Sequence, residues 1–221
     1  MIGNILHPRI VENKDWATAL FIFAFVLIAI AKSMFENRFN EFSRLIISDK
    51  YIKVYRDSSQ MSSWFTVSLF VVQLISLSFF IQLALHTFGI VSKTDWLIYI
   101  QIFTFLTFYI LSRYLIELII ATAFDIEEFV AQFNLQKVSY RTYIGVFLLP
   151  INCFLFYSDS ISKELLLGFI AIVLIINLFT YLVSLKNYQN ILMGKLFYFI
   201  LYLCALEIAP YYFMYYWFTK N

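Results

Sequence analysis

Cysteine, histidine, glycine and proline are all scarce in this chain, which holds two, two, five and three of them in 221 residues. Cys153 and Cys204 lie inside apolar runs, where a thiol behaves as a small hydrophobic group, so we expect neither a disulfide framework nor a metal site. His7 and His86 cannot supply a paired-histidine metal motif or a triad. The scattered glycines exclude a phosphate-binding loop. The sequence therefore predicts no enzyme and no cofactor.

Charge is scarce as well. Only 14% of the residues are charged and the formal net charge is +2, which gives no reason to expect nucleic-acid binding. In contrast, 62% are hydrophobic and 21% aromatic, far from the composition of a soluble protein, which is about half apolar and a quarter charged. No connection between the apolar runs is large enough to build a soluble core. We therefore expect one membrane domain, residues 1–221.

Six apolar runs define the expected fold, an all-α polytopic membrane helix bundle. The runs are long enough to be read as transmembrane helices, although the fourth is short. They cover residues 16–33, 64–88, 96–124, 143–157, 164–185 and 196–218. The four tryptophans, Trp16, Trp64, Trp96 and Trp217, fall at span ends, where an indole ring prefers to lie, and this independently supports the boundaries.

The first run ends in Ala29-Ile30-Ala31, which imitates a signal-peptidase site. A cleaved signal peptide is therefore an alternative to a first transmembrane helix. Positive charge is concentrated after this run rather than before it, at Lys32, Arg38 and Arg44, and this favours the transmembrane helix.

One or two amphipathic helices are expected at the membrane interface. Phe35, Phe39, Phe42 and Ile46 recur at spacings of four, three and four, so they share one helical face, with Arg38 elsewhere. That face would lie on lipid, as in a simple connector, or on a docking partner. Residues 125–135 form a second amphipathic segment.

Positive charges are distributed unevenly between the two sides of the predicted bundle. The first, third and fifth connections, with the adjoining ends of the apolar runs, hold eleven of the sixteen Lys and Arg residues: Lys32, Arg38, Arg44, Lys50, Lys53, Arg56, Arg113, Lys137, Arg141, Lys186 and Lys195. By the positive-inside rule these connections are cytoplasmic, and both termini lie outside the cytoplasm.

Several polar side chains are predicted to lie near the middle of the bilayer. At a rise of about 1.5 Å per residue, Gln73 and Asn152 are each roughly 14 Å from the cytoplasmic ends of their runs, Asn177 about 12 Å and Glu207 about 18 Å. A carboxylate at such a depth is costly unless it is neutral, hydrated or paired, so Glu207 should face the bundle interior.

Arg113 is the basic residue that lies within an apolar run. Two positions are possible for its side chain. In the first it stays near the inner interface, where it extends toward the head groups or pairs with Glu117 one turn later. In the second its helix shifts by about a turn and Arg113 pairs with Glu207.

Two prolines, Pro150 and Pro210, interrupt apolar runs beside these polar groups and are candidate helix breaks. Interrupted helices at the bilayer midplane build binding sites in many transporters, whereas in other membrane proteins proline only shapes packing. The two halves of the chain show no convincing internal repeat, so a transporter is the secondary hypothesis.

Two segments resemble the best-marked stretches of a bacterial inner-membrane family catalogued as a domain of unknown function. They are GVFLLPINCFLF, residues 145–156, and LYLCALEIAPYYF, residues 201–213. The resemblance implies a bacterial multi-pass inner-membrane protein and carries over no catalytic residues.

Two functions remain open. The first is a non-catalytic accessory or scaffold subunit of an envelope assembly for protein export or biogenesis, with the lipid bilayer and other membrane protein subunits as partners. The alternative is a small transporter or proton-coupled carrier that uses Glu207. The candidate polar site comprises Gln73, Arg113, Glu117, Asn152, Asn177 and Glu207.

The charge asymmetry generates a topological prediction. Cysteines introduced at positions 3 and 221 should react with a membrane-impermeant thiol reagent applied from the periplasm, and a cysteine at position 57 should not. Labelling of position 57 from outside would contradict the orientation.

Overall fold

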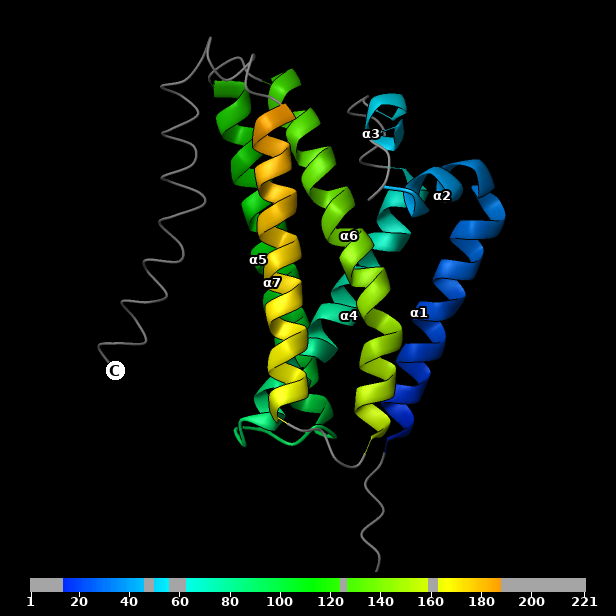
Figure 1. Cartoon of the computed structure of the whole chain (residues 1–221), viewed down its shortest axis with the longest axis vertical. Helices are drawn as coiled ribbons and strands as arrows, with labels where there is room; N and C mark the ends of the chain where they lie inside the picture. Colours follow the sequence, from blue (N-terminus) through cyan, green and yellow to red (C-terminus); the bar gives the residue numbers. More distant parts are fainter. Residues whose placement is uncertain (1–13, 46–49, 56–62, 124–126, 159–162, 188–221) are drawn as a thin grey trace, which may run out of the picture.

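The computed structural model describes residues 14–45, 50–55, 63–123, 127–158 and 163–187, and these residues form helices joined by short connections (Figure 1). The helices are α1 (Asp15–Met34), α2 (Glu36–Ser43), α3 (Lys50–Val54), α4 (Trp64–Thr87), α5 (Trp96–Ala123), α6 (Glu127–Tyr157) and α7 (Lys163–Asn187). The predicted all-α class is confirmed for this part of the chain.

Four of the described helices are long and apolar enough to cross a membrane: Asp15–Met34, Trp64–Thr87, Trp96–Ala123 and Val130–Tyr157. The first three match the predicted runs closely at both ends. Helix α7 covers the fifth predicted run, and the sixth, residues 196–218, lies outside the described residues. The total of six spans therefore stays a prediction.

Helix α6 differs from its prediction. An amphipathic segment at 125–135 and a separate short span at 143–157 were expected, but one helix of 31 residues runs from Glu127 to Tyr157. Its polar first half does not end in a loop because several of its polar side chains are buried against neighbouring helices: Gln132, Asn134, Gln136, Ser139 and Thr142.

The predicted helix break at Pro150 is also wrong. Pro150 lies inside α6 and the helix continues past it. Its side chain is exposed on the outer surface of the bundle. Proline removes one backbone donor, and membrane helices tolerate this loss without ending.

The long helices run up and down, so the bundle has two different ends (Figure 1). Helices α2 and α3 lie at one end, which we call the cap end, together with the end of α5 and the start of α6. The α4–α5 turn lies at the other end, the turn end, where α6 also finishes and α7 begins. Successive connections therefore alternate between ends as the sequence predicts.

Helix α4 is the centre of the bundle and packs against α1, α5, α6 and α7, most extensively against α6. Toward the turn end its Phe79 is buried among aromatic rings of three other helices. The ring of Phe21 stacks on it at 4.3 Å, Tyr99 lies at 4.5 Å and Phe156 meets it edge-on at 5.7 Å between centroids. Such pairs contribute about 0.5–1.5 kcal/mol each beyond the area they bury.

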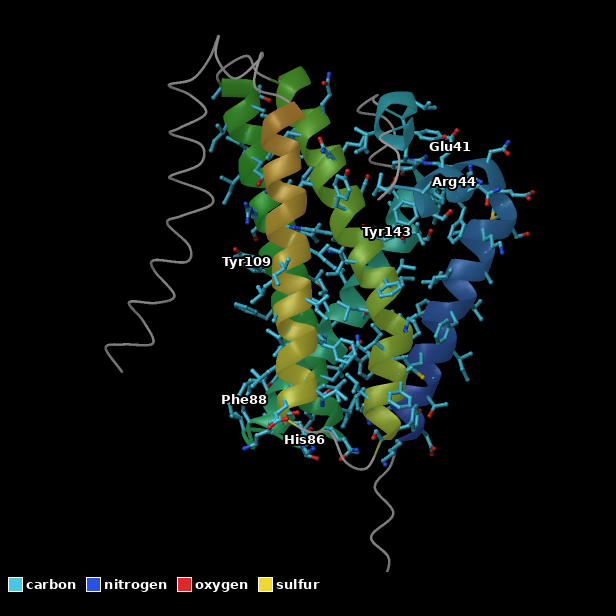
Figure 2. All side chains as sticks on the ribbon, viewed as in Figure 1. Glu41, Arg44, His86, Phe88, Tyr109 and Tyr143 are labelled. Atoms are coloured by element: carbon cyan, nitrogen blue, oxygen red, sulfur yellow. The ribbon has the colours of Figure 1, made fainter. Side chains whose placement is uncertain are left out.

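The turn end is closed by side chains that bind the α4–α5 turn. Gln82 donates to the carbonyl oxygen of Asp95 at 2.8 Å, and the indole N–H of Trp16 donates to that of Thr94 at 3.2 Å. Gly89 adopts a φ of 76°, which permits the turn. Figure 2 shows His86 and Phe88 beside this turn. The ends of α1, α4 and α5 are thereby held together.

The expected amphipathic face of residues 35–46 is occupied by the protein itself. Phe42 of α2 is 3% exposed and packs against Phe65 of α4, 5.8 Å between ring centroids, and against Tyr143 of α6 at 5.7 Å. Phe35 and Phe39 are half-buried in the same cluster, and Ile46 lies outside the described residues. The prediction of a face directed wholly at lipid or a partner is therefore corrected: Phe35 and Phe42 contact α4 and α6, and Phe39 packs against Phe42.

Candidate functional site

A polar seam runs along the contact between α4 and α6. Thr142 donates to the side-chain oxygen of Gln73 at 2.9 Å, and the amide nitrogen of Asn152 donates to the carbonyl oxygen of Ser76 at 2.7 Å and to its hydroxyl at 3.1 Å. All four residues are buried. The structure thus brings two predicted site residues, Gln73 and Asn152, into one interface, each with its own partner.

The two helices approach closely enough for this seam because Gly145 has no side chain. A Cβ atom built at Gly145 would lie 2.8 Å from the Cα atom of Gln73, closer than two such atoms come in proteins. Small residues at a membrane helix contact allow the backbones to approach and polar side chains to bond across it.

A buried charged cluster joins α5 to α6. Nε of Arg113 lies 3.1 Å from Oε1 of Glu117, and Nζ of Lys137 lies 3.0 Å from the same oxygen. The side chains are 8%, 3% and 10% exposed in that order. The local Arg113–Glu117 pair, one of the two sequence alternatives, is therefore present. The sequence did not indicate Lys137, which is twenty residues further along the chain.

A separate buried cation, Arg38, lies at the cap end. Its guanidinium donates to the hydroxyls of Ser63 at 2.9 Å and Thr66 at 3.1 Å, at the start of α4. It also lies over the rings of Tyr55 at 4.6 Å and Phe65 at 4.7 Å. Such cation–π contacts contribute about 2 kcal/mol each when desolvated. Arg38 therefore joins α2 to α4 and to the end of α3.

The third helix contributes Tyr51 to this arrangement. Its hydroxyl accepts from the guanidinium of Arg38 at 3.4 Å. Burial raises the pKa of Tyr51, and the positive charge of Arg38 partly opposes that rise. The tyrosine is therefore a neutral hydrogen-bonding link between α3 and α2.

Sequence reasoning placed Arg38 on the polar side of its helix, and this is wrong. Arg38 follows Phe35 by three residues and precedes Phe42 by four, a spacing that puts it between them on the same face. That spacing was the feature of the sequence from which the burial of Arg38 could have been predicted. Tyr143 of α6 also reaches this region, donating to the carbonyl oxygen of Ser43 at 3.4 Å (Figure 2).

The remaining predicted site residues do not join these groups through any contact that the structure describes. The side-chain amide of Asn177 donates to the carbonyl oxygen of Val173 in its own helix at 2.9 Å. Glu207 and Pro210 lie outside the described residues. Within residues 14–45, 50–55, 63–123, 127–158 and 163–187, no group of three or more His, Cys, Asp or Glu side chains is placed to hold a metal ion.

A family model described as a domain of unknown function, DUF4271, matches residues 17–218, almost the whole chain. The chain belongs to the DUF4271 family. No curated protein and no solved structure matches it. The DUF4271 match covers the polar seam and both cation sites, and it confirms the resemblance to an uncharacterised family.

The arrangement of charges and amides suits helix packing. Hydroxyl and amide groups of the seam bond across α4 and α6, the carboxylate of Glu117 is held by two cations, and Arg38 binds hydroxyls and rings. In a membrane such polar contacts fix which helices meet and in which register. The DUF4271 domain described here is therefore a bundle held by specific polar contacts as well as by apolar packing.

The burial of Arg38 yields a prediction, for which the exposed Arg44 directly after α2 is the matched control. Arg38→Gln should lower the free energy of unfolding by roughly 2–3 kcal/mol, because it removes charged hydrogen bonds and cation–π contacts. Arg44→Gln makes the same charge change at an exposed residue and should have little effect. Thermal unfolding of both variants in mild detergent measures the difference. Equal melting temperatures would contradict the role given to Arg38.

Proposed function

We propose that this DUF4271 protein is a non-catalytic subunit of a larger assembly in the bacterial inner membrane, an accessory or scaffold component of an envelope protein-export or biogenesis machine. In this proposal the packed helices α1, α4 and α6 form the framework, and α5 offers the surface that meets the partner. The partner is a transmembrane helix able to hydrogen-bond with that surface.

The unequal burial of the spans is the observation that carries this proposal. Of the most apolar stretch of α4, 61% of the residues are buried, against 11% for α5. The exposed apolar residues of α5 extend over its whole length, from Trp96 and Leu97 to Ile119. Among the residues that the structure describes, this helix of 28 residues is thus covered on one narrow face.

The exposed face of α5 is not purely apolar, and this argues for a protein partner rather than lipid. Gln101 and Thr104 are exposed together with Phe105 and Phe108, whose side chains are 69% and 72% exposed. Spacings of three and four place these residues on one side of the helix. An amide facing hydrocarbon is unfavourable, whereas a hydrogen bond to a second helix in the membrane contributes about 0.6–2 kcal/mol.

The orientation proposed for this subunit follows from charge. Lys32 and Arg44 belong to the cap end, where they are exposed, and the buried Arg38 and the partly buried Lys137 lie toward the same end. The positive-inside rule then supports a cytoplasmic cap end, a periplasmic turn end and periplasmic termini.

Two pairs of substitutions test the proposed assembly face. Phe105→Ala with Phe108→Ala removes two exposed rings from α5, and Phe23→Ala with Val26→Ala removes exposed apolar side chains at the same spacing from α1. Each tagged protein is purified from native membranes in mild detergent, and co-purifying proteins are quantified by mass spectrometry. We expect a stoichiometric membrane partner with the unchanged protein and the α1 variant, and loss of most of it with the α5 variant.

Two results would contradict the proposal. One is a monodisperse protein without any stoichiometric partner. The other is equal retention of the partner by the two double variants, since lipid alone would then account for the exposed face of α5. Melting temperatures of both variants in detergent show whether either has lost its fold.

A further inference from the structure

The helix contacts within this bundle place small residues of one helix against larger residues of another. Helix α1 meets α4 through Ala17, Ala24 and Ala31, which are spaced by seven residues and are at most 2% exposed. The contact between α4 and α6 depends on a glycine, and the contact between α5 and α6 includes the fully buried Ala121. Small residues let helix backbones approach each other in a membrane, where lipid supplies no hydrophobic force between helices.

The exposed face of α5 has no such small residues of its own. From Trp96 to Ile120 the helix contains neither glycine nor alanine, and its exposed side chains include Phe105 and Phe108, which are 69% and 72% exposed. A second copy of α5 would place large side chains against large side chains. The apolar run 196–218 of the same chain has alanine only at positions 205 and 209 and has no glycine. Close packing on α5 therefore requires a helix that brings its own small residues.

Two polar side chains on this face lack the hydrogen bond that similar groups make elsewhere in the bundle. The hydroxyls of Thr107 and Ser139 each donate, at 2.7 Å, to the backbone carbonyl oxygen four residues earlier. The side chains of Gln101 and Thr104 make no hydrogen bond to the part of the chain that the structure describes. They follow Trp96 by five and eight residues, which places them about 8 Å and 12 Å along the helix from its turn-end start. Hydrocarbon offers them no partner, whereas a second helix does.

We infer that the partner of α5 is a transmembrane helix of a different protein, with a small residue at every seventh position and one amide or hydroxyl side chain that bonds to Gln101 and Thr104. This inference rests on the proposed function, in which α5 meets a partner helix, and it adds the chemistry of that helix. A seven-residue spacing keeps the small residues on the side that faces α5 when two helices cross at a small angle, as the alanines of α1 face α4. The polar side chain of the partner lies in the half of the membrane at the turn end.

Synthetic transmembrane peptides test this chemistry without the native partner. The first peptide is a leucine helix with alanine at every seventh position and one asparagine about 8–12 Å from the end that matches the turn end. The second has leucine in place of the asparagine, and the third has leucine in place of the alanines. The complete chain, with Cys153→Ala, Cys204→Ala and a donor fluorophore on Lys163→Cys at an exposed position, is reconstituted in liposomes. Energy transfer to acceptor-labelled peptide measures association.

The first peptide should associate with the protein roughly three- to thirty-fold more tightly than the second, because one membrane hydrogen bond is gained, and also more tightly than the third. In the chain with Gln101→Leu and Thr104→Val, which keeps the side chains at similar size, the first and second peptides should associate equally. Thr122→Val, at an exposed hydroxyl near the other end of α5, is the matched control and should keep the preference for asparagine.

Three results would overturn the inference. Equal association of the three peptides with the unchanged protein would show that lipid or the chain itself covers this face. A preference for asparagine that survives Gln101→Leu with Thr104→Val would place the peptide elsewhere on the protein. Energy transfer between two labelled copies of the chain that this double variant abolishes would make a second copy the occupant. None of these results depends on a native partner, and the absence of such a partner from the purified protein contradicts the proposed assembly instead.

Discussion

The close contact between α4 and α6 at Gly145 is the constraint on which the rest of the bundle depends. Where Gly145 meets Gln73, the backbones come near enough for Thr142 and Asn152 to bond to α4 on either side of the contact. Lipid provides no hydrophobic force between helices, so close packing and such bonds must hold the pair together. Helices α1, α5 and α7 then pack around this pair, and the Phe79 ring cluster joins α1, α5 and α6 to α4.

At the cap end, buried cations likewise hold helices together through specific polar contacts. Arg38 attaches the connection between the first two spans to the start of α4, and Glu117 attaches α5 to α6 through Lys137. Each contact joins segments that are distant in sequence. Each includes a buried charged side chain, Arg38 or Glu117, which would be left in an unfavourable environment if its partner were removed. A bundle built in this way holds its helices in one arrangement, which suits a subunit that presents a fixed surface to a partner.

The sequence predicted the parts of this fold that depend on local pattern. The apolar runs of α1, α4 and α5 are bounded by tryptophan and by polar residues, and their ends were predicted closely. The Arg113–Glu117 pair follows from a spacing of four on one helix. The continuous helix α6 was not predicted because Gln132, Asn134 and Gln136 suggest a solvated connection unless their burial by other helices is known. Lys137 was missed for the same reason, since its partner Glu117 lies twenty residues earlier in the chain. The burial of Arg38 was missed although its spacing from Phe35 and Phe42 places it on their face.

Two glycine substitutions test the central contact most directly. Gly145→Leu places a side chain where a Cβ atom alone would lie 2.8 Å from the Gln73 backbone, whereas Gly168→Leu places the same side chain on α7 where nothing lies within 4 Å of the new Cβ. We predict that Gly145→Leu sharply lowers the melting temperature and the amount of folded protein in the membrane, while Gly168→Leu leaves both unchanged or slightly raised, since leucine favours a helix over glycine. Equal stability of the two variants would contradict the account.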